Sequence, residues 1–275
     1  MTNLKNNTNK CCSTNNTDTN CTVDIEQCDI FHFMANVAGL TVLHPGGFKA
    51  TDELAKTCKI GKNTQVLDIA CGKGTSAYYF AKKFDCQIMG IDIDEKLVNQ
   101  AKELAEKKGM GDKLTFKVAN AEKLPFSDNE FDVTIFQAAL VLIENMEQAV
   151  AEAIRVTKPG GRIGVLELTW RKEPPKESLE EAKTEICAYC IPRAKTCEGW
   201  KRLLFTNLLL EKEARTYKMG STHMIREEGI SNVFKVMLKW LFNSSIRNRM
   251  NKVDNFFKKN DEHLGYGIYV GQKSG

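Results

Sequence analysis

Apolar and polar residues alternate in a regular way between residues 65 and 168. Three segments have the spacing of amphipathic helices, in which apolar residues recur every three or four positions: Thr75–Lys83, Glu95–Lys108 and Asn145–Val156. Shorter apolar runs around them predict buried strands: Gln65–Ile69, Gln87–Asp92, Leu114–Val118, Phe131–Phe136 and Arg162–Leu168. Because strands that alternate with helices form a parallel sheet with helices on both faces, the pattern predicts an α/β fold.

Outside this region the pattern is less regular. Residues 1–22 are rich in Asn and Thr and have almost no apolar side chains, so we expect a disordered tail. Residues 23–275 are long enough to form one domain, and Tyr266–Gln272 is expected to be its last strand. Helical segments that cap this domain are predicted near residues 23–58, 172–205 and 225–260.

The last of these cap segments has a broad apolar face between Val233 and Phe242. Such a face fits three interpretations. They are the buried side of a helix, a lid over a hydrophobic substrate, and a patch that contacts a membrane surface.

Two glycines, Gly72 and Gly74, separate the first predicted strand from the first predicted helix. Asp92 follows Gly72 by twenty residues and ends the second strand, so its carboxylate is expected beside the glycines at the edge of a parallel sheet. Glycines let a ligand approach the backbone, and a carboxylate accepts two hydrogen bonds from a ribose diol. The spacing therefore predicts a nucleotide-binding site.

Residues 72–77 also fit the dinucleotide fingerprint, with Ala77 in the last position. Asp68, however, lies at the end of the preceding strand, where its negative charge would repel a pyrophosphate and attract an ammonium or sulfonium group. This favours S-adenosylmethionine as the cofactor and disfavours an NAD-dependent oxidoreductase.

Three further blocks follow the glycine loop in a set order, at residues 119–126, 131–136 and 155–161. With the loop, they resemble class I S-adenosylmethionine-dependent methyltransferases of the small-molecule type, similar to ubiquinone and menaquinone C-methyltransferases and natural-product methyltransferases. The resemblance implies a Rossmann-like, seven-stranded, mostly parallel sheet with an antiparallel last strand and a helical cap.

The resemblance also implies which residues bind the cofactor. Asp68 and the loop glycines would hold its amino-acid part, Asp92 the ribose, and Ile93 the adenine. Asn120 occupies a position where the family usually has Asp, so its contact with the adenine amino group would lack charge assistance. The implied set is Asp68, Gly72, Gly74, Asp92, Ile93, Asn120, Ala121 and Gln137.

Methyl transfer is an in-line displacement, and a proton acceptor helps it only when the nucleophile is a hydroxyl or a carbon acid. The catalytic residue is therefore left open. Weak candidates for a general base are His44, Glu167, Tyr189 and His223.

We expect an enzyme that methylates a lipophilic or aromatic small molecule. The alternatives left open are a regulatory module that binds S-adenosylmethionine without turnover and an RNA methyltransferase. With 39 basic and 35 acidic residues the charge is nearly balanced, so no nucleic-acid partner is expected. The oligomeric state is left open.

No apolar run approaches the length of a membrane span, and the first residues lack the apolar core of a signal peptide, so a cytoplasmic location is expected. The ten cysteines should then be free thiols, and a packing role is favoured over a metal or redox cluster. A helix predicted over Ser178–Ile191 would place Cys187 and Cys190 on one face, and no metal site is expected.

Overall fold

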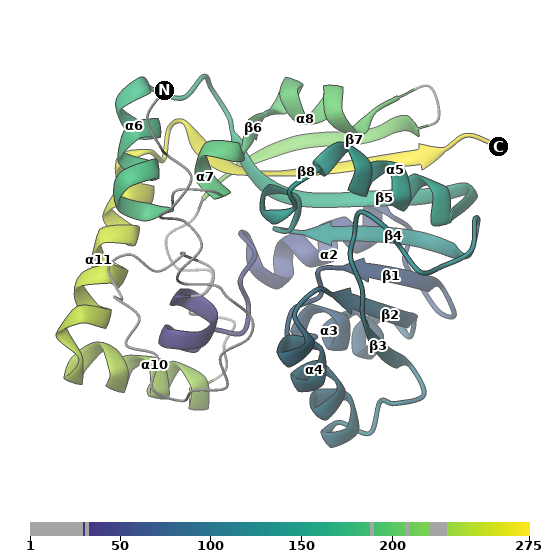
Figure 1. The fold of residues 1–275 in the computed structure, drawn as a ribbon, viewed down its shortest axis with the longest axis horizontal. Coiled ribbons are helices and arrows are strands. Elements are labelled where there is room, and N and C mark those ends of the chain that lie inside the picture. The colour runs from purple at the N-terminus through teal and green to yellow at the C-terminus, as the bar shows by residue number, and fades with distance from the viewer. Residues whose placement is uncertain (1–29, 31–32, 188–189, 207–208, 220–229) are drawn as a thin grey trace, which may run out of the picture.

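The computed structural model describes residues 30, 33–187, 190–206, 209–219 and 230–275. One sheet runs through it in the order β3-β2-β1-β4-β5-β8-β7, with the short β6 paired to β5 (Figure 1). Strands β1 to β6 are mutually parallel where they pair, and β8 is antiparallel to both of its neighbours. The bounds are β1 Gln65–Ile69, β2 Gln87–Asp92, β3 Leu114–Val118, β4 Phe131–Gln137, β5 Thr157–Trp170, β6 Lys195–Thr196, β7 Leu209–Lys218 and β8 Leu264–Lys273.

The predicted α/β class, the parallel strands and the antiparallel last strand are confirmed. Two details differ from the prediction. The two-residue β6 adds an eighth strand to the expected seven. Strand β5 also begins at Thr157 rather than Arg162, because Thr157 already pairs with Phe131 before a register shift in the β4–β5 ladder.

Helices cover both faces of the sheet. The buried side chains of α2, α3 and α4 form one apolar cluster with one face, and those of α5 and α8 belong to a second cluster with the other face. Strand β1 alternates between them, since Val66 packs in the first cluster and Leu67 in the second. The bounds are α2 Gly47–Thr57, α3 Thr75–Phe84, α4 Glu95–Lys107, α5 Met146–Val156 and α8 Cys197–Leu204.

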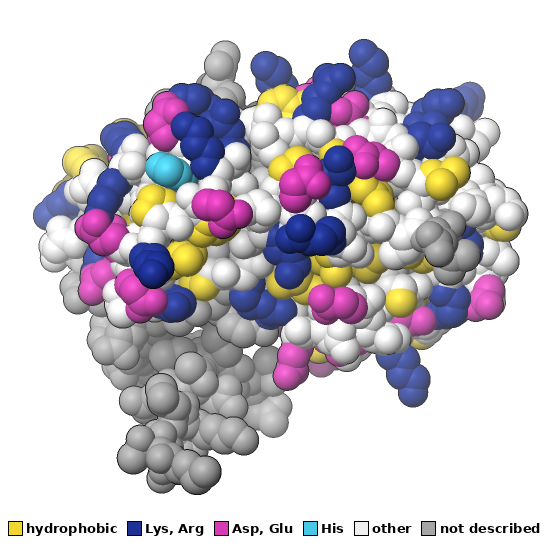
Figure 2. Space-filling model, turned by 90° about the horizontal axis from the view of Figure 1, so that it is seen from above, with side chains coloured by type: hydrophobic (Ala, Val, Ile, Leu, Met, Phe, Trp, Pro, Cys, Tyr) yellow, Lys and Arg dark blue, Asp and Glu magenta, His cyan; other side chains and the backbone are white. Residues whose placement is uncertain are grey.

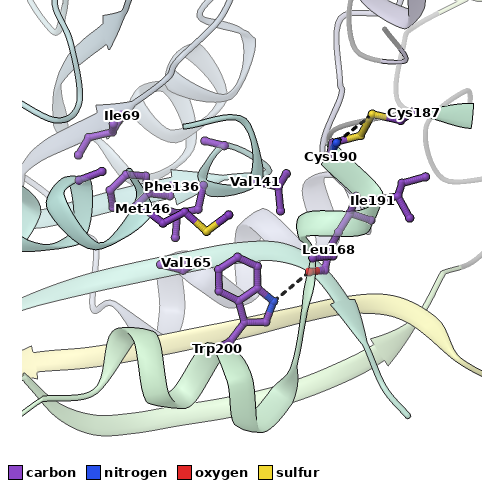
Figure 3. Packing of buried hydrophobic residues seen from close by; sticks show 14 of the residues in the cluster. Ile69, Phe136, Val141, Met146, Val165, Leu168, Cys187, Cys190, Ile191 and Trp200 are labelled. Carbon is purple, nitrogen blue, oxygen red and sulfur yellow. Dashed lines mark hydrogen bonds between the residues drawn. A yellow bond between two sulfur atoms is a disulfide. The ribbon is translucent and has the colours of Figure 1, made fainter. Parts of the chain in front are cut away.

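The second cluster joins the sheet to the cap. Figure 3 shows Trp200 of α8 lying along β5, where its indole N–H donates to the carbonyl oxygen of Leu168 at 3.0 Å. Val141, which follows β4, and Ile191 lie in the same cluster. This packing fixes the end of β5 against the segments that follow it.

The remaining helices gather on the side toward which the parallel strands end (Figure 1). Arg249 is buried and donates through its guanidinium to the carbonyl oxygens of Glu185 and Ile186, which ties α11 to the segment after α6. The bounds are α6 Lys176–Glu181, α7 Cys190–Arg193, α10 Ile230–Phe242 and α11 Ser244–Lys259, with π-helical turns at Phe33–Ala38 and Ala182–Ile186.

The continuous helix predicted over Ser178–Ile191 is wrong, and so is the prediction of free thiols at two of the cysteines. The helix ends where Cys187 adopts an extended backbone conformation, and the chain turns so that Cys187 forms a disulfide with Cys190. Their Cα atoms are 6.0 Å apart, within the usual range for a disulfide. The other described cysteines are free thiols, as predicted: Cys58, Cys71, Cys86 and Cys197.

Charges of both signs are interspersed over the face seen in Figure 2. Among the described residues, no helix is long and apolar enough to cross a bilayer.

Candidate cofactor site

The glycine loop lies between β1 and α3 at the end of the sheet. Gly72 and Gly74 both have positive φ angles, of 55° and 73°, and Gly74 is the N-cap of α3. A methyl group on Gly74 would come within 2.9 Å of Ala101 and of the Phe116 ring. One on Gly72 would meet no atom within 4 Å, so the loop presents open space at this glycine, as a ligand that approaches the backbone requires.

Asp92 lies at the end of β2 and faces this loop. Its carboxylate accepts hydrogen bonds from the backbone N–H groups of Gly72, at 2.9 Å, and Asp94, at 3.0 Å. Burial raises the pKa of the carboxyl above its ordinary value, although these backbone donors act in the opposite direction. The predicted proximity of the carboxylate and the glycines is therefore present in the structure.

Asp68 lies beneath the loop at the end of β1 and is only 2% exposed. Within the described part of the chain, its Oδ2 atom has no hydrogen-bond partner. Burial and the neighbouring charge of Asp92 raise the pKa of Asp68 to about 7. A buried carboxyl in this state is complementary to a cationic ligand, because an ammonium or sulfonium group would stabilise its ionised form.

Binding of S-adenosylmethionine is therefore expected to release protons from Asp68. At pH 6.5 a carboxyl with a pKa of about 7 is mostly protonated, and a bound cation would lower that pKa. Calorimetric titrations in buffers with different ionisation enthalpies would show a release of most of one proton per bound cofactor. Asp68→Asn should remove the release, and an equal release from this variant would contradict the assignment.

The residues predicted to surround the adenine lie on the loops after β2 and β3. Ile93 is 74% exposed, so its apolar side chain is accessible for a ring to pack against. Asn120 is exposed, and its side-chain oxygen accepts a hydrogen bond from the backbone N–H of Glu122 at 2.8 Å. This bond fixes the turn in which Ala121 is half-buried.

Gln137, at the end of β4, is connected to the loop before α2 through a residue that the sequence did not single out. Thr51 donates to Oε1 of Gln137 at 3.1 Å, and its hydroxyl lies 3.3 Å from Nε2 of His44. The side-chain nitrogen of Gln137 is buried and has no partner among the described residues. No motif in the sequence indicates that Thr51 connects these residues, because the contact joins positions 86 residues apart.

His44 is buried in this arrangement, at 4% exposed, and burial lowers its pKa to about 4. It is therefore neutral at physiological pH and touches Thr51 rather than solvent. These contacts support a positioning role for His44 more than a role as general base.

The low pKa of His44 has a measurable effect on stability. His44 binds a proton near pH 6.5 in the unfolded chain and only near pH 4 in the folded chain, so its protonation favours unfolding across this interval. We expect the free energy of unfolding to fall, relative to His44→Gln, by about 3 kcal/mol between pH 7 and pH 4. Urea titrations at several pH values would test this. The raised pKa values of Asp68 and Glu167 have the opposite effect, because they lower the free energy of unfolding as the pH rises, and they do so equally in both proteins. If the unmodified protein and His44→Gln gave parallel pH profiles, His44 would contribute nothing to the pH dependence.

Glu167, the second candidate base, is fully buried under the loop that follows β4. Its carboxylate accepts hydrogen bonds from the backbone N–H groups of Leu168, at 2.9 Å, and Val141, at 3.5 Å. Burial raises its pKa to about 7, against the effect of these donors. The contacts show Glu167 holding the post-β4 loop in place. The other two candidates, Tyr189 and His223, lie outside the described residues.

Lys73, inside the glycine loop, connects the site to the cap. Its ammonium group donates to the carbonyl oxygen of Ala35 at 2.8 Å, in the π-helical turn Phe33–Ala38. From the other side, Asn232 and Lys239 of α10 donate to the carbonyl oxygens of Gly39 and Val37, at 3.0 and 2.8 Å. This turn is thus held between the glycine loop and α10.

The site is that of a nucleotide-binding α/β protein, and comparisons with known proteins identify its class. The family described as "Methyltransferase domain" matches residues 60–219. An uncharacterized protein of Haemophilus influenzae is 34% identical over 212 residues, which cover 75% of this chain and 83% of that protein. The chain therefore belongs to this methyltransferase family, the class I S-adenosylmethionine-dependent enzymes.

Two named proteins extend this comparison. Sterol 24-C-methyltransferase ERG6B of Gibberella zeae is 35% identical over 133 residues, covering 48% of this chain and 35% of that protein. The match thus spans about a third of the length of this relative. The crystal structure of MccD protein, 23% identical, superimposes with a TM-score of 0.72 over 85% of this chain and 100% of that chain, which shows a shared fold.

Proposed function

We propose that this chain transfers the methyl group of S-adenosylmethionine to a lipophilic or aromatic small molecule. The observation that carries the proposal is the buried carboxyl of Asp68, whose Oδ2 is unpartnered among the described residues, beside the glycine loop and Asp92. A cationic nucleoside cofactor would satisfy both carboxylates at once, since Asp68 would face its positive charge and Asp92 its ribose diol.

The cofactor, when bound, supplies a methyl group activated by a positively charged sulfur. The chain's own contribution is then to align the reactants and exclude water. Asp68 would balance the positive charge, the open space at Gly72 would admit the amino-acid part, and Asp92 would hold the ribose. No side chain has to move a proton unless the acceptor is a hydroxyl or a carbon acid.

An apolar acceptor is supported by the residues around the site. Phe33 and Met34, in the turn that Lys73 holds, belong to the same buried apolar cluster as Leu140 and Val141 after β4. The Gibberella zeae relative is named for a sterol, which is itself a lipophilic acceptor. The domain limits of 23–275, the tail at 1–22, the cytoplasmic location and the lack of a nucleic-acid partner stay predictions from the sequence.

The test is turnover with S-adenosylmethionine labelled in its methyl group. Purified protein would be incubated with sterols, prenylated quinols, phenols and RNA transcripts, and methylated product and S-adenosylhomocysteine would be measured. Label in an apolar small molecule supports the proposal. Label in RNA would contradict it, and tight cofactor binding without label in any acceptor would favour a regulatory module.

A further inference from the structure

Helix α10 carries an apolar surface that the proposed site does not use. Among the described residues, eight large apolar side chains are exposed, and four of them lie on this one helix: Phe234, Met237, Leu241 and Phe242. We call these four residues the α10 face. Spacings of three and four residues place the first three on one side of the helix, and Phe242, at its end, is 84% exposed.

The opposite side of the helix is already packed. Val236 is 4% exposed and belongs to the buried cluster that joins the sheet to the cap. Asn232 and Lys239 hold the turn Phe33–Ala38 through its carbonyl end. The helix is therefore anchored in the fold while a second apolar side faces outward.

The charged residues of α10 and of the first part of α11 are all positive. From Ser231 to Val253 the sequence contains five basic residues and no acidic one. Four of the five make contacts within the fold. Lys239, Arg247 and Arg249 donate to backbone carbonyl oxygens, and Lys252 pairs with Glu185. Lys235, next to Phe234, and Arg247, which donates to the carbonyl oxygen of Leu241, border the apolar side chains, whereas Lys239 lies on the packed side.

We propose that the α10 face docks on the surface of an anionic lipid bilayer. A helix with Phe, Leu and Met exposed on one side and basic residues at its border has the composition of helices that lie in the headgroup region. A second copy of the chain fits less well. A two-fold interface would bring Lys235 and Arg247 of both copies together, with no acidic residue between Ser231 and Val253 to pair with them.

Docking would serve the proposed function, because a lipophilic acceptor resides in the bilayer. Helix α10 also holds the turn that Lys73 connects to the glycine loop, so the docked helix would be joined to the site through the turn Phe33–Ala38. Bilayer binding needs neither cofactor nor turnover, so the failure of this proposal and the failure of the proposed function can be told apart.

The experiment is flotation of the full chain with vesicles of phosphatidylcholine alone or with equal parts phosphatidylcholine and phosphatidylserine. We expect binding to the mixed vesicles, weakened by salt, and about tenfold or more weaker for Leu241→Ser combined with Phe242→Ser. The matched control is Leu210→Ser on β7, since Leu210 is 53% exposed and Leu241 48%. Lys235→Glu should weaken binding about fivefold or more through the loss of a lysine near the surface.

Trp240 gives a second readout within α10. The chain has three tryptophans, and Trp170 and Trp200 are buried whereas Trp240 is partly exposed. Lipids with brominated chains should therefore quench fluorescence from Trp240 in mixed vesicles. Absence of flotation by the unmodified chain would overturn the proposal. Equal flotation of the Leu241→Ser/Phe242→Ser double variant and the Leu210→Ser control would overturn it too. A dimer in solution that dissociates on Leu241→Ser would assign the face to a second copy instead.

Discussion

Replacement of Asp92 by alanine is expected to weaken the binding of S-adenosylmethionine about 100-fold or more, because two charge-assisted hydrogen bonds to the ribose are lost at about 1.5–3 kcal/mol each. The carboxylate also accepts from the N–H groups of Gly72 and Asp94, so the loop loses a support at the same time. Isothermal titration calorimetry with S-adenosylmethionine, S-adenosylhomocysteine and NAD measures the effect.

The control is Asp94→Ala, two residues further along the chain. Asp94 caps α4 by accepting from the N–H groups of Lys96 and Leu97, at 2.8 and 3.4 Å. Its loss should cost about 1 kcal/mol of stability and leave cofactor affinity nearly unchanged. If Asp92→Ala bound the cofactor as tightly as the unmodified protein, the ribose contact assigned to Asp92 would be wrong. Tight binding of NAD alone would overturn the choice of cofactor.

Alanine at the two loop glycines is expected to affect stability mainly at Gly74 and cofactor affinity mainly at Gly72. Gly74→Ala should lower the free energy of unfolding by about 2–4 kcal/mol, because the backbone at this position has a positive φ angle and the added methyl group meets Ala101 and Phe116 at 2.9 Å. Gly72→Ala should cost only about 1–2 kcal/mol, since its methyl group points into open space. Ala70, at a φ of 59°, shows that this loop already holds an alanine in such a conformation.

Gly72→Ala should instead lose cofactor affinity, about tenfold or more, because the added methyl group occupies the space assigned to the ligand. Urea denaturation gives the stability of both variants, and calorimetry gives the affinity of the folded Gly72 variant. Normal cofactor affinity in a folded Gly72→Ala protein would show that no ligand approaches the backbone at this position.

The core of the fold was predictable because its signals are local. Each of the first four strands begins at the residue that its apolar run predicted, and the helices between them begin within one residue of prediction. The same short-range pattern placed Asp92 beside Gly72, because adjacent parallel strands end at one edge of the sheet.

The cap was less predictable because its conformation depends on contacts between distant segments. The predicted helix over Ser178–Ile191 has acceptable helical composition, yet it ends at Cys187, where the backbone turns toward the disulfide with Cys190. Arg249 meets the carbonyl oxygens of Glu185 and Ile186 from about sixty residues further along the chain. Such long-range contacts override local propensity.

By itself the sequence determined the class of fold, the glycine loop and the carboxylates beside it, since apolar periodicity and fixed motif spacing express these features within a few tens of residues. Only the tertiary structure decided that His44 and Glu167 are buried behind the site, that Thr51 connects His44 to Gln137, and that Lys73 holds the turn Phe33–Ala38. Burial and hydrogen-bond partners depend on which distant segments pack together, and that information is absent from the spacing of residues along one strand or helix.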